Sequence, residues 1–308
     1  MLDFIIISGP TAVGKTKFVN DLSSKLNAEI ISADSQAVYK YLDIGTAKPK
    51  KSQRDKYHLI NLVEPDEIYD VSNFIEDADK KITELKNRGK KVIICGGTPM
   101  YINKLIYGLD DMPGRNPEIR RKLDKAVEKN GREHLYNKLQ KIDPKSAEKI
   151  HPNDLYRVKR ALEIYYVSGK TRTQWHSKEK KSRYNYLYYI FSRNRENLYN
   201  RINKRVEKMI EKGLINEVED LVKNKGFNGN EKGFKAIGYE EVVDFLENKI
   251  SRQEMIRLIK RNTRHFAKRQ LIWYRKEEDT IELNLDTEGY NEIFSKILTD
   301  IKEKGGLK

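Results

Sequence analysis

The stretch Leu2–Thr16, LDFIIISGPTAVGKT, decides the fold. Its first half is a largely apolar run ended by Gly-Pro, which is typical of a strand buried on both faces of a sheet. Gly9–Thr16 then match the pattern G-x-x-x-x-G-K-[ST] of a phosphate-binding loop, and residues 15–26 are expected to form a helix. The stretch therefore predicts a strand, a loop and a helix that together bind a di- or triphosphate group.

The same alternation continues along the chain. Further apolar runs predict strands at 29–33, 58–63, 91–95, 186–192 and 280–285. Between and after them, helices are expected at 15–26, 72–88, 196–212, 214–225, 238–248 and 251–276. Strands that alternate with helices imply a parallel sheet with right-handed crossovers. In such sheets, ligands bind at the carboxyl ends of the strands.

From about Gly114 the pattern becomes helical, with a helix after Asp154 that is expected to end at Gly169. The predicted fold class is α/β: a phosphate-loop parallel sheet flanked by helices, with an inserted all-helical basic domain. We expect the catalytic core and its C-terminal helices to comprise residues 1–114 and 190–308, and the insertion residues 115–189.

Charge is unevenly distributed. The chain holds 61 Lys+Arg against 46 Asp+Glu, a net charge of +15. Residues 1–114 are neutral, whereas 115–210 carry +15 and 251–276 carry +8. A neutral front end followed by two basic blocks indicates a small-molecule site joined to a polyanion-binding surface. The alternative is a lysine-rich surface that is merely solvated.

Composition excludes several classes of protein. Mean hydropathy is -0.79, and no apolar run approaches the roughly 20 residues of a spanning helix, so a membrane protein is not expected. The chain opens directly into a strand and not into a signal peptide. Cys95 is the single cysteine, which excludes a disulfide scaffold and a cysteine-clustered zinc site. We expect a cytoplasmic protein.

The phosphate loop suggests its own chemistry. Lys15 can contact the terminal phosphoryl oxygens, and the Thr16 hydroxyl can ligate Mg²⁺. A nucleotide hydrolase would carry an aspartate at the end of a second strand, but residues 91–95 run into Gly96-Gly97-Thr98. The carboxylate that follows a strand is Asp34, which could remove a proton from an acceptor or merely cap a helix.

At this point the motifs resemble those of a known family, the tRNA dimethylallyltransferases. They occur in order over most of the chain. They are Gly9–Thr16 (GPTAVGKT), Asp34-Ser35-Gln36 with Val38-Tyr39, Asp43–Pro49 (DIGTAKP), Gly96-Gly97-Thr98 with Tyr101, His151–Asp154 (HPND), Arg157-x-x-Arg160-Ala161-Leu162-Glu163, Ile237-Gly238-Tyr239 and Lys268-Arg269-Gln270-x-x-Trp273.

The resemblance implies transfer of a dimethylallyl group from dimethylallyl diphosphate to N6 of adenosine 37, next to the tRNA anticodon, with release of diphosphate. It implies Asp34 as general base, Thr98 as the residue that orients Asp34 and the amine, and Lys15 with Mg²⁺ as stabilisers of the leaving group. The implied diphosphate-binding residues are Gly9, Pro10, Thr11, Ala12, Val13, Gly14, Lys15, Thr16 and Lys235. At the Lys235 position relatives can carry arginine, and lysine keeps the charge but not the bidentate fork.

The resemblance also implies contacts to the anticodon stem-loop. The residues concerned are Asp34, Ser35, Gln36, Ala37, Thr98, Tyr156, Arg157, Val158, Lys159, Arg160, Lys268, Arg269, Gln270, Trp273 and Arg275. Basic side chains at helical spacing support this, and Trp273 could stack on a base or serve as a core aromatic. We expect a bacterial-type monomer.

Three other functions compete with this one. A phosphate-loop small-molecule kinase would use Asp34 as base for a hydroxyl acceptor, but it leaves DIGTAKP and the basic blocks without a role. An enzyme that prenylates free adenine nucleotides would lack an RNA-binding insertion. A non-catalytic RNA-binding module gives the phosphate loop no role.

Overall fold

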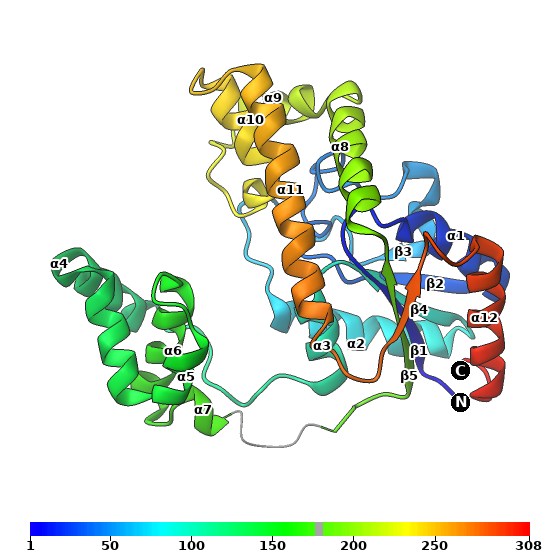
Figure 1. The fold of residues 1–308 in the computed structure, drawn as a ribbon, viewed down its shortest axis with the longest axis horizontal. Coiled ribbons are helices and arrows are strands. Elements are labelled where there is room, and N and C mark those ends of the chain that lie inside the picture. The colour runs from blue at the N-terminus through cyan, green and yellow to red at the C-terminus, as the bar shows by residue number, and fades with distance from the viewer. Residues whose placement is uncertain (176–180) are drawn as a thin grey trace. The chain divides into compact units, whose positions relative to one another are not determined.

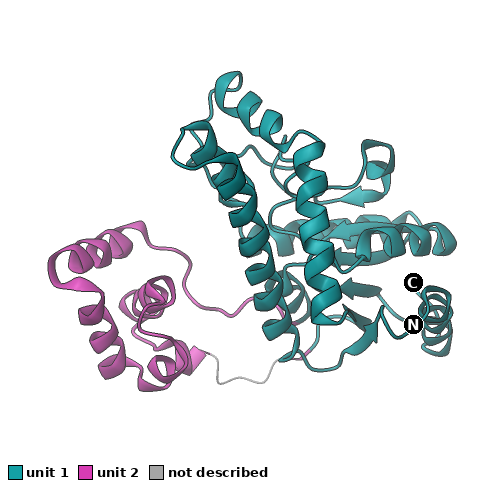
Figure 2. Cartoon of the chain, turned by 45° about the horizontal axis from the view of Figure 1, so that its top comes forward, with its two compact units in different colours: residues 1–106, 182–308 teal, residues 107–181 magenta. Residues whose placement is uncertain are grey.

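The computed structural model describes residues 1–175 and 181–308. The chain divides into two compact units (Figures 1 and 2). Unit 1 comprises residues 1–106 and 182–308, and unit 2 comprises residues 107–181. Each unit has its own apolar core.

Unit 1 is built on a parallel sheet of six strands in the order β3-β2-β4-β1-β5-β6. The strands are β1 (Phe4–Ser8), β2 (Ala28–Ser32), β3 (Tyr57–His58), β4 (Lys91–Gly96), β5 (Tyr186–Ser192) and β6 (Ile281–Asn284). The apolar run that opens the chain becomes β1, between β4 and β5, with Ile5 opposite both Ile93 and Leu187. Every residue of β1 is buried, as its sequence requires. The predicted α/β fold with a parallel sheet is confirmed.

Helices cover both faces of the sheet (Figure 1). On one face, α1 (Lys15–Leu26), the first part of α8 (Arg195–Glu211) and α12 (Tyr290–Glu303) share a core with Ile5 and Ile7 of β1. On the other face lie α2 (Val71–Asn87) and α3 (Pro99–Tyr107), whose rings Phe74 and Tyr101 stack at 4.4 Å. Neither α3 nor α12 is predicted by the sequence analysis.

A second core lies beyond the sheet edge that carries the phosphate loop. It joins the later part of α8, α9 (Leu214–Lys223), α10 (Tyr239–Leu246) and the first half of α11 (Arg252–Tyr274) to residues 38–44. Two short 3₁₀ helices, η1 (Lys51–Lys56) and η2 (Gly233–Lys235), complete unit 1. The helices predicted for this part of the chain are all present.

The strand predicted at 58–63 is wrong beyond its first residue. Leu59 and Asn61 adopt positive φ, 59° and 54°, which breaks an extended strand. The backbone N–H groups of Asn61 and Leu62 instead donate to the carbonyls of Ala37 and Val38. This segment therefore braces the loop that follows β2 and does not extend the sheet.

In its described residues, 107–175 and 181, unit 2 contains the helices α4 (Pro117–Ile142), α5 (Pro144–Lys149), α6 (Leu155–Ser168) and α7 (Arg172–Trp175). A positive φ of 79° at Gly131 interrupts α4. Asp154 caps α6 by accepting from the Arg157 N–H, and Gly169 ends α6 in the left-handed conformation, as predicted. In the chain, this helical unit lies between the two segments of unit 1.

The bounds of the insertion differ from the predicted 115–189. Unit 2 begins at Tyr107, directly where α3 ends, and stops at Lys181, ahead of β5. The backbone N–H of Arg183 donates to the Ile106 carbonyl at 2.8 Å, which fixes the segment before β5 to unit 1. Within the described residues, no helix is both long and apolar enough to cross a membrane.

Candidate active site

The phosphate loop connects β1 to α1 at the carboxyl edge of the sheet. Gly9 and Gly14 have φ of 143° and 121°, values that side chains rarely adopt. A Cβ on Gly9 would also lie 2.4 Å from the Phe191 carbonyl oxygen. These glycines let the loop curl over the first turn of α1, where backbone N–H groups can receive an anion.

Two arginines that the sequence analysis missed hold the outside of this loop. The Nε of Arg193 donates to the Val13 carbonyl and the Nε of Arg201 to the Ala12 carbonyl, both at 2.8 Å. Arg193 is itself paired with Asp286, just after β6. These bonds tie two carbonyl oxygens of the loop to α8 and to the segment that precedes it.

Lys15 lies inside the loop. Its Nζ donates to the carbonyls of Gly9 at 2.7 Å and Pro10 at 3.0 Å. Burial lowers the pKa of Lys15 to about 8, against the opposing effect of the nearby Asp34. An anion bound in the loop would favour the protonated form.

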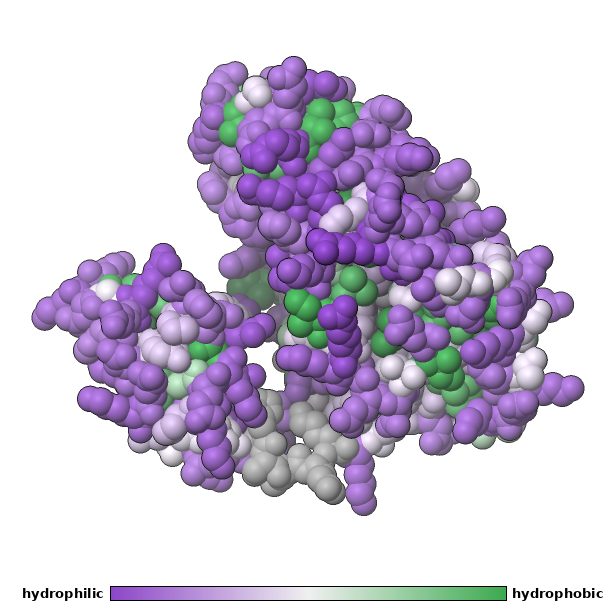
Figure 3. Space-filling view, in the orientation of Figure 1, coloured by the Kyte–Doolittle hydropathy of each residue, from purple (hydrophilic) through white to green (hydrophobic). Residues whose placement is uncertain are grey.

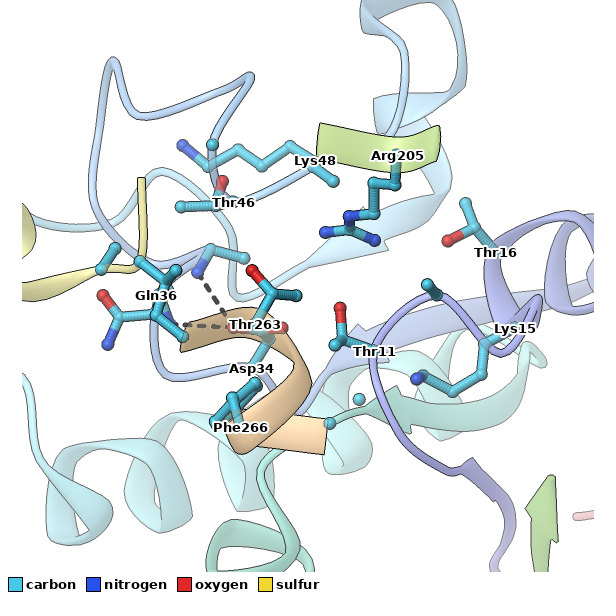
Figure 4. A pocket seen from close by; sticks show the side chains of 18 of the residues that line it. Thr11, Lys15, Thr16, Asp34, Gln36, Thr46, Lys48, Arg205, Thr263 and Phe266 are labelled. Carbon is cyan, nitrogen blue, oxygen red and sulfur yellow. Dashed lines mark hydrogen bonds between the residues drawn. The ribbon is translucent and has the colours of Figure 1, made fainter. Parts of the chain in front are cut away.

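Asp34 follows β2, and its carboxylate is oriented by backbone N–H groups of the turn that follows it. Its Oδ1 accepts from the N–H groups of Gln36 at 2.9 Å and Ala37 at 3.4 Å (Figure 4). Thr98, from the turn after β4, accepts the Ser35 N–H on its Oγ1 at 3.0 Å. The ends of β2 and β4 are adjacent because these strands pair, so the two predicted catalytic residues share one turn network.

The loop and Asp34 line a single cavity of about 670 Å³. Nine lysine and arginine side chains line it among the described residues, against one carboxylate, that of Asp34. Because its lining carries this excess of positive charge, the cavity favours an anionic ligand. The Asp34 carboxylate is the acidic side chain of the lining that can accept a proton. Its apolar lining includes Met209, Ile237, Ile259 and Phe266, so part of the ligand can be hydrocarbon.

The strongest feature missed by the sequence analysis is Arg205, on α8. It reaches into the cavity from the side opposite Asp34 (Figure 4). Burial lowers its pKa, while Asp34 favours its charge. Within the described residues its guanidinium makes no ion pair and no hydrogen bond. The signal was present in the spacing of Arg201, Lys204, Arg205 and Lys208, which line one face of a helix.

The DIGTAKP motif forms the cavity wall that faces the phosphate loop. Thr46 and Lys48 line the cavity (Figure 4). The Nζ of Lys48 is fully buried and donates to the Tyr39 carbonyl and to the side chains of Asp43 and Asn61. Lys48 therefore shapes the wall, and its charge is already neutralised by Asp43.

The remaining predicted residues of unit 1 divide into those that reach the cavity and those that do not. Ser35, Gln36, Ala37, Arg269 and Gln270 line it, as does Lys235, whose Nζ also pairs with Glu240 at 2.8 Å. Lys268, Trp273 and Arg275 do not line it. Lys268 is exposed on α11, and the Trp273 indole donates to Glu277.

Five predicted residues belong to α6 in unit 2. Tyr156 and Arg157 are exposed, at 62% for Tyr156 and 60% for the Arg157 side chain. Val158 is buried and packs in the core of the unit. Lys159 pairs with Asp124. Arg160 donates to the buried carboxylate of Glu163 at 2.8 Å and to the Pro113 carbonyl at 2.6 Å, so its guanidinium is committed to the fold.

Comparisons with known proteins converge on one family. Residues 37–277 match the model of a family described as IPP transferase. The chain is 43% identical over 307 residues to a tRNA dimethylallyltransferase of Acetivibrio thermocellus, covering 98% of this chain and 97% of that protein. It is 45% identical over 302 residues to the enzyme of the same name from Carboxydothermus hydrogenoformans, covering 96% of each.

Solved structures agree. A tRNA isopentenylpyrophosphate transferase from Bacillus halodurans superposes with a TM-score of 0.72 at 38% identity, covering 98% of this chain and 97% of that one. A eukaryotic dimethylallyltransferase acting on tRNA superposes with a TM-score of 0.82 at 28% identity, covering 98% of this chain and 80% of that one.

Proposed function

Because this chain belongs to the IPP transferase family, the tRNA dimethylallyltransferases, we propose that it transfers the dimethylallyl group of dimethylallyl diphosphate to N6 of adenosine 37, next to the tRNA anticodon. The family and the enzyme class predicted from the motifs are confirmed. The observation that carries the finer proposal is the cavity itself, which combines nine cations, one carboxylate and an apolar wall.

The diphosphate is bound at the phosphate loop. Backbone N–H groups at the start of α1 and the Nζ of Lys15 contact its oxygens, as in other loops of this pattern. Arg205 supplies a planar guanidinium from the opposite side, and its fork suits two phosphoryl oxygens. Lys235 adds charge at the rim. Together these groups stabilise the negative charge that develops as diphosphate departs.

Asp34 acts as the general base. The N6 amine is conjugated with the adenine ring and must lose a proton as the C–N bond forms. Because Oδ1 is occupied by the Gln36 and Ala37 N–H groups, Oδ2 is the atom left to accept it. Thr98 fixes the turn that carries Asp34 through its bond to Ser35. General-base catalysis of this kind contributes about 10²–10⁴ in rate.

The residues present suit a magnesium ion bound together with the diphosphate. Thr16 lines the cavity with its hydroxyl on the first turn of α1. In the described part of the chain, no three histidine, cysteine or acidic side chains gather to hold a metal by themselves. That fits Mg²⁺, which takes most ligands from phosphate and water. When bound, it would neutralise part of the charge on the leaving group.

The hydrocarbon part of the substrate rests on the apolar wall. Met209, Ile237 and Ile259 come from α8, the segment before α10, and α11. A five-carbon group placed there leaves the diphosphate at the loop and the reactive carbon between Arg205 and Asp34. Apolar side chains beside the reactive carbon would leave fewer polar groups there to hold a water molecule.

We assign tRNA to the basic surface around this cavity and on unit 2. The predicted tRNA contacts that the described fold leaves exposed at the end of α11 and on α6 are Lys268, Arg269, Trp273, Arg275, Tyr156 and Arg157. The face shown in Figure 3 is largely hydrophilic, and it is the Lys and Arg side chains among its polar groups that would bind RNA phosphates. We further propose that the protein works in the cytoplasm as a monomer.

The deciding experiment offers radiolabelled dimethylallyl diphosphate with unmodified tRNA, with AMP, or with hydroxyl acceptors and ATP. Label that enters tRNA alone, at adenosine 37, supports the proposal. Label that enters AMP would favour a prenyltransferase of free adenine nucleotides. Phosphate transferred from ATP to a hydroxyl acceptor would instead establish a small-molecule kinase.

A further inference from the structure

Gln270 is an uncharged, buried residue on the most basic helix of unit 1. Its side chain is on the inner side of α11 and the residue is only 3% exposed. Both ends of its amide are used. Oε1 accepts the Thr11 N–H at 2.9 Å, and Nε2 donates to the Gly97 carbonyl at 2.5 Å. The motifs suggested an RNA contact for this residue, whereas in the structure its amide is buried and bonded to two loops of the cavity.

The amide joins the two halves of the reaction centre. Thr11 belongs to the loop that we assign to the diphosphate. Gly97 directly precedes Thr98, which holds the turn of Asp34 through Ser35. Gly97 also makes room for the bridge, because a Cβ there would lie 2.7 Å from Nε2 of Gln270 and no closer than 3.8 Å to any other group.

Tyr274, one helical turn later, reinforces the same connection. Its hydroxyl lies 2.6 Å from Oγ of Ser8 and 3.4 Å from the Gly9 carbonyl, and Ser8 donates to Gly96. The inner side of α11 thus holds the ends of β1 and β4. The outer side of the same turns carries the exposed Lys268, Arg269 and Trp273.

We propose that Gln270 is a positioning residue that sets the spacing between the diphosphate loop and the Thr98–Asp34 turn, and so couples tRNA engagement by α11 to diphosphate binding. The inference rests on the proposed function. Its physical basis is geometric. The reacting atoms must be held about 3–3.5 Å apart and aligned, and a misplacement of about 1 Å can cost 10²-fold in rate. Because α11 contacts the phosphate loop and the Gly97–Thr98 turn on one side and would contact RNA on the other, a shift of α11 on tRNA binding would move both loops.

Two variants test this from opposite ends of the bridge. Gln270→Met keeps the length and volume of the side chain but makes neither hydrogen bond. Gly97→Ala leaves Gln270 intact and displaces its amide by steric overlap. The control is Gln253→Met, the same substitution at an exposed position on the same helix. If Gln270→Met fails to fold, Gly97→Ala still decides the question.

The measurement is the dissociation constant of inorganic diphosphate with Mg²⁺, with and without saturating tRNA that carries purine riboside at position 37 and so lacks the amine. In the wild-type protein, tRNA should tighten diphosphate binding about tenfold, within the usual range of coupling between sites. Either bridge variant should reduce this factor to below about twofold. Its affinity for tRNA alone and its melting temperature should stay close to those of Gln253→Met, and its single-turnover rate should fall about 10- to 100-fold.

Combining the two bridge variants should cost little more than either alone, because they break the same connection. Coupling and rate that survive in both variants would overturn the proposal, as would a wild-type protein that binds diphosphate equally well with and without tRNA. Prenyl transfer to tRNA by the wild-type protein is measured in parallel, so that a failure of the proposed function is seen separately from a failure of the bridge.

Discussion

The phenol of Tyr239 donates a 2.6 Å hydrogen bond to Oε1 of Glu217, and together the two residues anchor the DIGTAKP wall of the active site. The Glu217 carboxylate accepts the N–H groups of Asp43 and Ile44 at 3.0–3.1 Å, and the Tyr239 hydroxyl accepts that of Gly45 at 3.1 Å. Burial raises the pKa of Glu217 above its usual range, although each of these donors opposes the rise.

Removing the hydroxyl should therefore loosen this wall. Tyr239→Phe leaves the Gly45 N–H without its partner and removes one of the two hydrogen bonds that Oε1 of Glu217 accepts, and an unsatisfied buried group typically costs about 1–3 kcal/mol. We expect that loss in urea unfolding, together with a several-fold higher KM for dimethylallyl diphosphate, because Thr46 and Lys48 line the cavity. Tyr166→Phe, at a position 43% exposed, is the control. Equal unfolding energies for the two variants would contradict the anchoring role.

Asp34→Asn separates catalysis from structure. The asparagine carbonyl oxygen can still accept the Gln36 and Ala37 N–H groups, but the side chain can no longer take a proton. The rate constant of a single turnover should fall about 10²–10⁴-fold, while tRNA affinity and KM for dimethylallyl diphosphate change by no more than a few-fold. Rapid-quench measurement checks this, and a variant that keeps more than about a tenth of the wild-type rate would remove Asp34 as the base.

Arg205 and Lys235 should differ in their importance for the diphosphate. Arg205→Lys keeps the charge but loses the bidentate fork, and we expect a roughly tenfold rise in KM for dimethylallyl diphosphate. Lys235→Ala should have a smaller effect, since Lys235 is half-exposed and pairs with Glu240. Affinity for tRNA should not change in either variant. Steady-state kinetics with both substrates would reveal the reverse order if Lys235 were the principal contact.

Two neighbouring arginines of α6 should respond differently to charge reversal. Arg157 is largely exposed, so Arg157→Glu should weaken tRNA binding and reduce its salt dependence by about one phosphate contact. Arg160 is bonded to Glu163, so Arg160→Glu should instead lower the melting temperature. Dissociation constants at three salt concentrations test the first statement. Unchanged affinity and parallel salt slopes for Arg157→Glu would mean that this face is only solvated.

Glu163 makes the stability of unit 2 depend on pH. Burial tends to raise the pKa of its carboxyl, but hydrogen bonds from Arg120, the Asn116 N–H and Arg160 outweigh this and lower the pKa from 4.5 to about 2. The stabilisation is therefore present above about pH 4.5 and is lost as the pH falls toward 2. Glu163→Gln should cost about 3 kcal/mol at pH 7 and progressively less below pH 4.5.

The unfolding of unit 2 can be followed by the fluorescence of Trp175. For this measurement Trp273 is replaced by Phe in both the wild-type protein and the Glu163→Gln variant, so that Trp175 is the remaining tryptophan. A difference in unfolding free energy that stayed constant between pH 7 and pH 2.5 would show that the carboxylate contributes through its shape alone.

Local patterns predicted the sheet and the phosphate loop because their causes are local. The apolar run at residues 2–8 can be buried on both faces only in a central strand. The glycine-rich loop at residues 9–16 leads into a helix, whose N-terminal N–H groups favour an anion. The spacing of the basic residues marks a charged face of α8, but local patterns do not show that Arg205 reaches the cavity. That follows only from α8 folding back over a loop almost 200 residues earlier in the chain. The same is true of Gln270, whose family motif suggested RNA while its buried amide bonds to the cavity loops. The strand predicted at 58–63 was wrong for a related reason. Hydrogen bonds from this segment to the carbonyls of residues 37 and 38 accompany the positive φ angles of Leu59 and Asn61, and the apolar pattern of the segment does not indicate those angles.

The bond between the Arg183 N–H and the Ile106 carbonyl has a consequence for how such a chain could have arisen. The polypeptide leaves the sheet domain and re-enters it at practically one point, and the seventy-five residues between, 107–181, enclose a core of their own. A gene segment coding for them could be gained, lost or exchanged as a cassette without disturbing a single strand pairing. The two units would then be free to diversify at different rates, unit 1 under the constraint of a crowded cavity and unit 2 under that of its own core.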